Sequence, residues 1–399
     1  MSNTRPDPAL VVLLAGIAAA LHVGKLPPAI PALRDALSLT LVQAGFLLSL
    51  VQLAGMTMGA VFGLVADRLG GRRSMLLGLA VLGAASAAGG LATSALPLMA
   101  LRACEGFGFL LVVLPAPGWI RRLVAPERMS TMLGLWGAYM PAATALALLA
   151  GPLAIGAFGW RAWWWLLAAV SLAAALAVAA FVPAGIASAP ANGRWQSRLL
   201  RVLGTPAPWL LACSFSVYSG QWLAVVGFLP TIYQQAGIGG AAVGALTALA
   251  AGVNALGNLA GGALLQRGRP APRLLATGFA TMALAAALAF VDLGTPAVLR
   301  YLAVLAFSMV GGMVPATLFS LAVRCAPADD LVGTTIGWLQ QWSAIGQFCG
   351  PPLVAWVASH AGGWQWTWLV TGAFSLVGLA LTRAVALMLE KKRYAAIPG

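Results

Sequence analysis

The chain has 399 residues, of which 61% are hydrophobic and only 8% are charged, and its formal net charge is +14. Soluble domains carry about 25% charged residues, because a surface in contact with water has to be solvated. A chain this apolar cannot cover a water-facing surface. The composition therefore excludes an ordinary soluble domain. The positive balance alone would be compatible with nucleic-acid binding.

Apolar segments long enough to cross a bilayer follow one another along the chain. A spanning helix needs about 20 apolar residues, and the uncharged runs 202–266 and 331–382 are each long enough for two helices with a turn between them. Pro230 and Gly237 to Gly240 predict the turn in the first run, and Ser359 to Gly363 predict the turn in the second. We therefore predict an all-α membrane protein with twelve transmembrane helices, at residues 9–31, 42–64, 74–93, 97–119, 130–156, 162–183, 208–231, 242–264, 274–292, 297–322, 332–357 and 366–388.

Basic residues are distributed unevenly between the two ends of these spans. If both termini are cytoplasmic, the inner segments hold 18 basic residues, whereas the outer segments hold only Arg34, Arg161 and Arg300. An excess of basic residues in cytoplasmic segments is the usual signature of orientation. We expect a multi-pass protein of the bacterial inner membrane with both termini in the cytoplasm, and the same distribution explains the net charge without nucleic acid.

The N-terminus and the cysteines add two expected absences. Arg5 is the only basic residue before an apolar stretch that runs directly into the polytopic pattern, so no cleavable signal peptide is evident. Cys104, Cys213, Cys325 and Cys349 are scattered without the spacing of metal ligands. We expect no metal site and no cofactor.

An internal repeat becomes visible when the chain is shifted by about 199 residues, which places Pro31 on Pro230 and Gly63 on Gly262. Further along, Gly151-Pro152 meets Gly350-Pro351. An ordered series of matches at a nearly constant offset indicates a duplicated six-helix unit, a frequent design among transporters. We predict two pseudo-symmetric six-helix bundles, residues 1–183 and 208–399, joined by a cytoplasmic linker at 184–207.

The segment after the second span combines glycines with charged residues. A glycine lets two helices approach closely, and an acid with several arginines at a helix junction can form ion pairs that hold one conformation and are released in another. The spacing resembles the signature loop of the major facilitator superfamily, although that pattern has a basic residue at Gly71. The counterpart loop, Gly262 to Arg273, keeps Arg267 but has Gln266 in place of the acid. The resemblance implies a gating role, the alternative being that the arginines only set orientation, for Gly63, Asp67, Arg68, Gly70, Arg72 and Arg73.

Two other segments are similar to patterns of the same family. Arg102 and Glu105 in the fourth span resemble its Arg-x-x-Gln-Gly pattern, with Glu105 in the glutamine position. The series Gly337, Gly346, Gly350-Pro351 resembles a glycine-proline motif of drug antiporters, which we interpret as a packing element. The resemblance covers nearly the whole chain and implies the major facilitator fold. More loosely, the first span resembles the cyanate and nitroimidazole transporter branch.

Ionisable side chains occur inside the predicted spans of the first half. Charged groups at bilayer depth cost several kcal/mol, so they usually face a cavity or a partner. Pro27 and Pro28 leave the carbonyls of Val23 and Gly24 without their usual partners, and a broken helix beside the Lys25 cation suggests a binding site. The alternative is that Lys25 reaches the outer membrane surface. The four ionisable residues are His22, Lys25, Arg102 and Glu105.

Arg102 and Glu105 are three residues apart and share a helix face. One interpretation is a mutual structural ion pair. The other is that Glu105 binds the proton that couples transport, with His22 as the second group that titrates near neutral pH. The second half offers neutral polar groups instead, for which helix-to-helix hydrogen bonds are the alternative to substrate contacts. The candidate substrate-binding residues are His22, Lys25, Arg102, Tyr139, Gln221, Asn254, Gln340 and Gln341.

These features favour a secondary active transporter that works by alternating access and is coupled to protons. Our leading hypothesis is transport of a small organic anion or weak acid, attracted by Lys25 and Arg102. The alternative is a proton-coupled exporter of hydrophobic or cationic compounds, with Glu105 as the important charge. The chain lacks P-loop, zincin and GxSxG signatures, so we do not expect an enzyme. Expected partners are a small-molecule substrate, protons and membrane lipid, and we expect a monomer.

Overall fold

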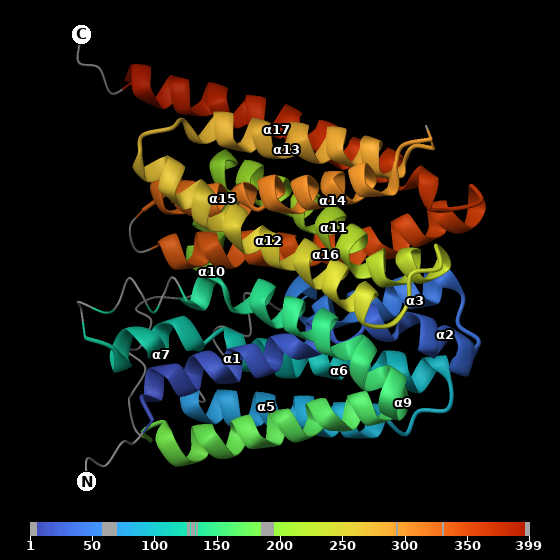
Figure 1. Ribbon diagram of the computed structural model, residues 1–399. Helices are drawn as coiled ribbons and strands as arrows, with labels where there is room; N and C mark the ends of the chain where they lie inside the picture. Colours follow the sequence, from blue (N-terminus) through green and yellow to red (C-terminus); the bar gives the residue numbers. More distant parts are fainter. Residues whose placement is uncertain are drawn as a thin grey trace. The chain divides into compact units, whose positions relative to one another are not determined.

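The computed structural model describes residues 6–57, 70–125, 128, 132, 135–184, 195–292, 294–328 and 331–395. Within these ranges every regular element is a helix (Figure 1). The prediction of an all-α protein is therefore confirmed.

The residues group into two compact units, Met1–Ala191 with Gly227–Gly252, and Asn192–Val226 with Val253–Gly399. Two long helices, α11 and α12, contribute to both units. The first unit also contains α1 Pro8–Gly24, η1 Pro27–Ala29, α2 Ile30–Leu37, α3 Leu41–Ser49, η2 Leu50–Gln52, α5 Gly71–Gly89, α6 Ala95–Val113, α7 Ala116–Leu123 and α9 Tyr139–Phe181. The second contains α10 Trp195–Leu203, α13 Ala271–Phe290, α14 Ala297–Gly311, α15 Met313–Cys325, α16 Val332–His360, η4 Trp364–Trp366 and α17 Thr367–Ala395. The predicted division at 184–207 stays a prediction.

Eight helices in the described part of the chain are long and apolar enough to cross a membrane. One of them, α9, has 43 residues and covers two predicted spans. Gly159, with φ 80°, interrupts it between those spans, a conformation that glycine adopts without steric cost. The remaining predicted spans correspond to shorter or less apolar helices, including Leu41–Thr57, α5 and α16.

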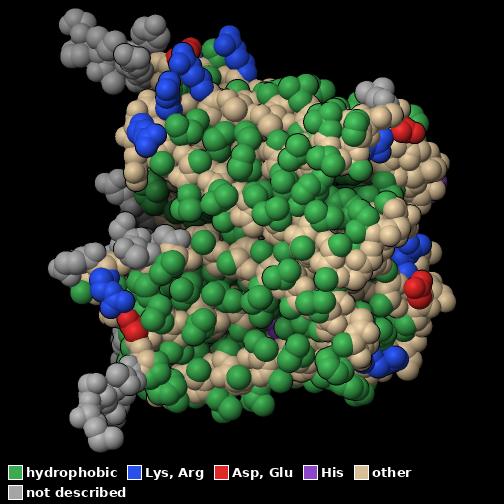
Figure 2. Space-filling view, in the orientation of Figure 1, with side chains coloured by type: hydrophobic (Ala, Val, Ile, Leu, Met, Phe, Trp, Pro, Cys, Tyr) green, Lys and Arg blue, Asp and Glu red, His purple; other side chains and the backbone are tan. Residues whose placement is uncertain are grey.

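Side chains on the visible face agree with a membrane environment. Figure 2 shows hydrophobic side chains spread over this face, with Lys, Arg, Asp and Glu gathered towards the helix ends. Large apolar side chains such as Leu14, Phe158 and Leu284 are 61%, 78% and 73% exposed. A soluble monomer rarely exposes so much continuous apolar surface.

The first predicted turn is confirmed at its glycines, because α11 (Pro206–Gln235) ends just before Gly237, which has φ 82°, and α12 (Gly240–Gln266) follows. Pro230 is not part of the turn, because α11 continues through it. One lost backbone hydrogen bond is tolerated inside an apolar helix when neighbouring elements support it. The second predicted turn is confirmed: α16 ends at His360, and Gly362 has φ 85°.

The first predicted span is broken where its prolines lie. Helix α1 ends at Gly24, and the short η1 begins at Pro27. Just before the break, α1 packs closely on α9, because a Cβ added to Gly24 would lie 2.9 Å from Ala147 Cβ. Small residues thus hold the end of α1 against α9, and this fixes the position of the residues at the break.

Glycines serve the same purpose in the second unit. A Cβ on Gly346 would overlap the Ser216 carbonyl, and one on Gly350 would overlap the Gly220 carbonyl, so α11 and α16 approach backbone to backbone. The packing interpretation is confirmed at these two positions. Gly337 has open space around it.

Candidate functional site

Four ionisable side chains meet in the interior of the first unit. His22 and Lys25 come from the end of α1, and Arg102 and Glu105 come from α6. Their exposed fractions are 0%, 0%, 2% and 1%. The structure therefore brings the four predicted ionisable residues together, and we call them the ionic cluster.

Lys25 uses its whole hydrogen-bonding capacity inside this cluster. Its Nζ donates to Glu105 Oε1, to Ser86 Oγ at 3.0 Å, and to His22 Nδ1 at 3.4 Å. An ammonium group has three N–H donors, so each one has a partner. The cation also lies 4.6 Å from the centroid of the Trp164 ring. The alternative in which Lys25 reaches the membrane surface is wrong.

Glu105 joins two cations. Its Oε1 accepts from Lys25, and its Oε2 accepts from Arg102 Nη1 at 2.6 Å. The predicted ion pair between Arg102 and Glu105 is therefore present, with Lys25 as a third member. Two cations and one carboxylate leave a net charge of +1 in a site without solvent, where removing one partner is strongly destabilising.

Arg102 also supports the broken end of α1. Its Nη1 donates to the His22 carbonyl at 2.5 Å and its Nη2 to the Val23 carbonyl at 3.4 Å. Pro27 has no N–H to offer Val23, so Arg102 supplies the missing donor. The Val23 carbonyl, which the sequence predicts to lack its usual helical partner, therefore accepts from Arg102. A cation at the C-terminal end of a helix is also favoured by the helix dipole.

His22 connects the ionic cluster to α9. Its Nε2 lies 2.7 Å from Ser171 Oγ, and its Nδ1 faces the ammonium of Lys25. An ammonium group only donates, so we assign Nδ1 as the acceptor and place the ring proton on Nε2. In that tautomer His22 donates to Ser171 and stays neutral.

Sequence reasoning missed the residues that enclose this cluster. Ser86 accepts from Lys25 and donates to the Trp164 carbonyl at 2.8 Å, and Trp163 Nε1 donates to the Lys25 carbonyl at 3.0 Å. Trp163 and Trp164 are only 2% and 1% exposed, so their rings enclose the cluster on the side of α9. Ser86, one of two hydroxyl residues in the apolar helix α5, was the available signal.

The second unit repeats one of these hydrogen bonds without charge. Gln221 Oε1, on α11, accepts from Ser375 Oγ on α17 at 3.0 Å. The repeat places His22 on Gln221, and Ser375 matches Ser171 at nearly the same offset. Ala224 stands where the first unit has Lys25. The hydrogen bond is therefore conserved between the two units while the cation is not.

Arg300 falls close to Arg102 when the chain is shifted by about 199 residues, but it has a different role. It donates to Asp292 Oδ1 at 3.1 Å, at the exposed start of α14. Among the described residues, every buried charged side chain belongs to the first unit. The expectation of an ionic first half and a neutral second half is therefore confirmed for the described ranges.

The other candidate substrate residues lie in several places. Asn254 donates to Tyr218 Oη at 2.9 Å and to the Ser308 carbonyl at 2.8 Å, so the hydrogen-bonding alternative holds for it. Gln340 is exposed and Gln341 half-buried on α16. Tyr139, in the first unit, stacks on Trp136 with ring centroids 4.3 Å apart. Substrate contact by these residues stays a prediction.

A group of three tryptophans in the second unit was not anticipated. The Trp209 ring lies 4.8 Å from Trp338 and 5.6 Å from Trp342, centroid to centroid. The Nε1 donors of Trp338 and Trp342 are buried and have no hydrogen-bond partner among the residues described. The spacing of four residues on α16 was the available signal. We call these residues the tryptophan group.

The predicted gating segment is only partly described. Gly63, Asp67 and Arg68 lie outside the described residues. Gly70, with φ 77°, precedes α5, and Arg72 Nη2 donates to the Ala179 carbonyl of α9 at 2.6 Å. Arg73 is exposed. The gating role stays a prediction for these residues.

The glycine that departs from the family pattern has a packing reason. A Cβ on Gly71 would overlap the indole of Trp119, on α7. A basic side chain therefore has no room at this position.

Comparison with known proteins places the chain among transporters. The 2-nitroimidazole transporter of Escherichia coli (strain K12) is 31% identical over 252 residues, covering 60% of this chain and 62% of that protein. A chloramphenicol resistance protein of Streptomyces lividans is 31% identical over 216 residues, covering 53% and 54%. The tetracenomycin C resistance and export protein of Streptomyces glaucescens is 29% identical over 174 residues, covering 43% and 32%. The chain thus spans between 32% and 62% of the length of these relatives.

Solved structures share the fold over almost the full length. A bacterial homologue of the human lysosomal transporter Spinster has a TM-score of 0.80 at 16% identity, covering 95% of this chain and 96% of that one. A nucleoside transporter has a TM-score of 0.77 at 14% identity, covering 95% and 99%. A family model described as Major Facilitator Superfamily matches residues 9–348. From its fold and from this match, the chain belongs to the Major Facilitator Superfamily of multi-pass membrane transporters.

Proposed function

We propose that this chain is a proton-coupled exporter of uncharged aromatic compounds, in which the ionic cluster binds the coupling proton and not the substrate. The observation that carries this proposal is the arrangement around Lys25. All three of its N–H donors have partners inside the first unit, and its side chain is fully buried. A cation in this state has no donor left for a substrate carboxylate.

The cluster supports proton coupling because Glu105 holds two ion pairs at once. A proton on this carboxylate would remove the negative charge and leave Lys25 and Arg102 buried with a net charge of +2. Uncompensated buried charges are strongly destabilising. Protonation would therefore favour any conformation that separates or hydrates the two cations, which is how a proton shifts a two-state equilibrium.

The second unit supports an aromatic, uncharged substrate. The tryptophan group places three indole rings together, and two of its N–H donors are buried without a described partner, so an aromatic compound that enters between the rings would satisfy them. Aromatic rings attract other rings in offset or edge-to-face arrangements. The names of the three relatives point to chloramphenicol, tetracenomycin C and 2-nitroimidazole, each of which contains an aromatic ring.

One observation favours the organic anion as a second candidate. The ionic cluster has two cations for one carboxylate, so it keeps a net positive charge that a substrate anion could neutralise. This route requires the anion to replace Glu105 as a partner of Lys25 in another conformation. The two candidates differ in whether a substrate needs a negative charge.

A matched pair of probes separates the candidates. The purified chain in proteoliposomes with an imposed pH gradient would be given 1-methyl-2-nitroimidazole, which has no ionisable N–H and is uncharged at neutral pH, or 4-nitrobenzoate, which carries a carboxylate. We expect transport of 1-methyl-2-nitroimidazole, and retention of downhill transport in Lys25→Met. Transport of 4-nitrobenzoate alone, lost in Lys25→Met, would establish the anion transporter instead.

A further inference from the structure

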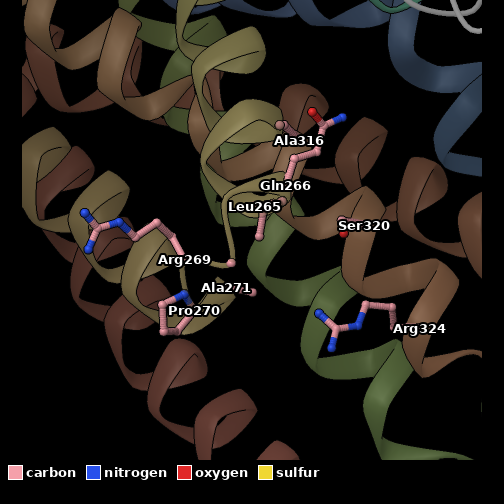
Figure 3. A pocket seen from close by; sticks show the side chains of 10 residues that line it. Leu265, Gln266, Arg269, Pro270, Ala271, Ala316, Ser320 and Arg324 are labelled. Carbon is pink, nitrogen blue, oxygen red and sulfur yellow. The ribbon is translucent and has the colours of Figure 1, made fainter.

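A cationic pocket in the second unit takes no part in the function proposed above. It has a volume of about 590 Å³ and lies between the end of α12, the start of α13 and the last turns of α15 (Figure 3). Two arginines, Arg269 and Arg324, line it together with Gln266 and Ser320. None of the residues lining it is an aspartate or a glutamate.

The pocket coincides with the ends of three apolar helical segments. Gln266 is the last residue of Gly240–Gln266, Ala271 begins Ala271–Phe290, and Arg324 is next to the end of Ala297–Cys325. The end of an apolar span marks the boundary between the hydrocarbon core and the headgroup layer. Lipid phosphate groups occupy that layer, and basic pockets between helices at this depth suit them.

The arginines of the pocket have no counterion of their own. Both are exposed, and neither Arg269 nor Arg324 has a hydrogen bond or ion pair within the described ranges. In the repeat, the equivalent loop of the first half carries an acid, whereas this loop has Gln266 in that place. The second copy of the signature loop thus retains its cations but lacks the carboxylate that would neutralise them.

The side chains leave room for a ligand between them. Figure 3 shows Arg324 reaching across the pocket towards Ala271, while Arg269 extends on the other side of the loop. An exposed arginine changes rotamer within nanoseconds, so Arg269 can turn towards a bound anion. The planar guanidinium matches two oxygens of a phosphate group at once. We infer that this pocket binds a phosphate group, carried either by an anionic phospholipid or by a soluble phosphate ester.

Binding is tested on the full-length purified chain. Nanodiscs of phosphatidylcholine with increasing fractions of phosphatidylglycerol give the melting temperature and the apparent affinity for the anionic lipid, because a ligand of the native state raises the melting temperature. We expect stabilisation by phosphatidylglycerol in the unmodified chain and a loss of affinity of roughly tenfold or more in Arg269→Gln/Arg324→Gln, since each charge-assisted hydrogen bond contributes more than a neutral one. Arg273→Gln, an exposed arginine of α13 outside the pocket, is the matched control.

A second variant keeps the test valid if the double variant folds poorly. Gln266→Glu adds a carboxylate to the lining of the same pocket, so we expect it to weaken phosphatidylglycerol binding while all arginines remain. In detergent, glycerol 1-phosphate that stabilises the chain through the same arginines would identify a soluble source, and stabilisation by phosphatidylglycerol alone would identify the lipid. Equal effects of phosphatidylglycerol on the unmodified chain and both variants, or no effect of either probe, would overturn the inference.

Discussion

In the first unit a histidine on α1 bonds to a serine on α9, and in the second a glutamine on α11 bonds to a serine on α17. The two contacts, His22 with Ser171 at 2.7 Å and Gln221 with Ser375 at 3.0 Å, are related by the internal repeat. Around the first contact lie Lys25 and two further charged residues, whereas Ala224 stands beside the second. The same scaffold thus supports one site with titratable side chains and one without them.

This difference indicates a division of labour between the units. An amide has no protonation change near neutral pH, so Gln221 keeps its charge state, whereas histidine and carboxylate groups can change theirs. Because its charges are buried, the first unit also loses much of its stability when one partner of an ion pair is removed. Four sets of substitutions test this difference between the units, from the largest expected loss of stability to the smallest.

Removing the carboxylate of the ionic cluster should have the largest effect. Glu105→Gln leaves Lys25 and Arg102 buried without a negative partner, and we expect a loss of about 3–5 kcal/mol in the free energy of unfolding. Thermal or denaturant unfolding in detergent measures this loss. Asp292→Asn, which removes the carboxylate of the exposed pair with Arg300 in the second unit, is the control and should cost less than about 1 kcal/mol.

The same variant offers an internal rescue. Adding Lys25→Met to Glu105→Gln removes one of the two uncompensated cations, so the double variant should be more stable than Glu105→Gln alone. If both substitutions simply add their costs, the two residues do not interact, and the assignment of this ion pair is contradicted.

Arg102→Lys should have the next largest effect. Lysine keeps the charge but cannot reach Glu105 and the carbonyls of His22 and Val23 together, because it lacks the planar fork. We expect a loss of about 2–3 kcal/mol, corresponding to one or two charge-assisted hydrogen bonds. Arg161→Lys, on an exposed arginine that donates to the Ala92 carbonyl, should change stability by less than about 0.5 kcal/mol. Equal stability of both variants would argue against the capping of α1 by Arg102.

Glycine substitutions test the close approach of helices in the second unit. A methyl group at Gly346 would overlap the Ser216 carbonyl, so Gly346→Ala should cost about 1–3 kcal/mol by overpacking. Gly337→Ala on the same helix meets open space and should stabilise α16 by about 0.5–1 kcal/mol. Melting temperatures that move in the same direction for both variants would contradict the assigned packing.

The smallest effect on stability is expected from exchanging the repeated residues. His22→Gln gives the first unit the amide of the second and keeps a partner for Ser171, so we expect a loss of less than about 1 kcal/mol. Gln221→His is the reciprocal variant. We expect the free energy of unfolding of Gln221→His to depend on pH in a way that the free energy of the unmodified chain does not. Denaturant unfolding of both variants at several pH values measures this. The absence of any such change would mean that this position cannot bind a proton.

Much of the fold followed from the distribution of apolar residues and prolines. Long uncharged runs located the spans, and Pro27 and Pro28 located the break in the first of them. Pro230 misled us, because a proline in an apolar helix is compatible with continued helix when the surrounding structure supports it. Local composition cannot distinguish these two outcomes.

The sequence was enough to predict which ionisable residues form the site, but not which hydrogen bonds they make. His22, Lys25, Arg102 and Glu105 stand out because charges are rare in apolar spans. The saturation of the Lys25 donors depends on Ser86, which is 61 residues away in sequence, and on α6. Trp163 and Trp164, which are also distant in sequence, close the ionic cluster off from solvent. Such contacts depend on helix rotation, which amino-acid composition does not determine.

In the proposed mechanism the ionic cluster serves the proton and not the substrate. This is tested with Lys25→Met/Glu105→Gln in proteoliposomes, with the flux of uncharged 1-methyl-2-nitroimidazole measured with and without a pH gradient. We predict that this variant moves the compound down its own concentration gradient but no longer concentrates it in response to pH, whereas the unmodified chain does both. Accumulation driven by pH in the variant, or a loss of downhill flux in a folded variant, would contradict the account.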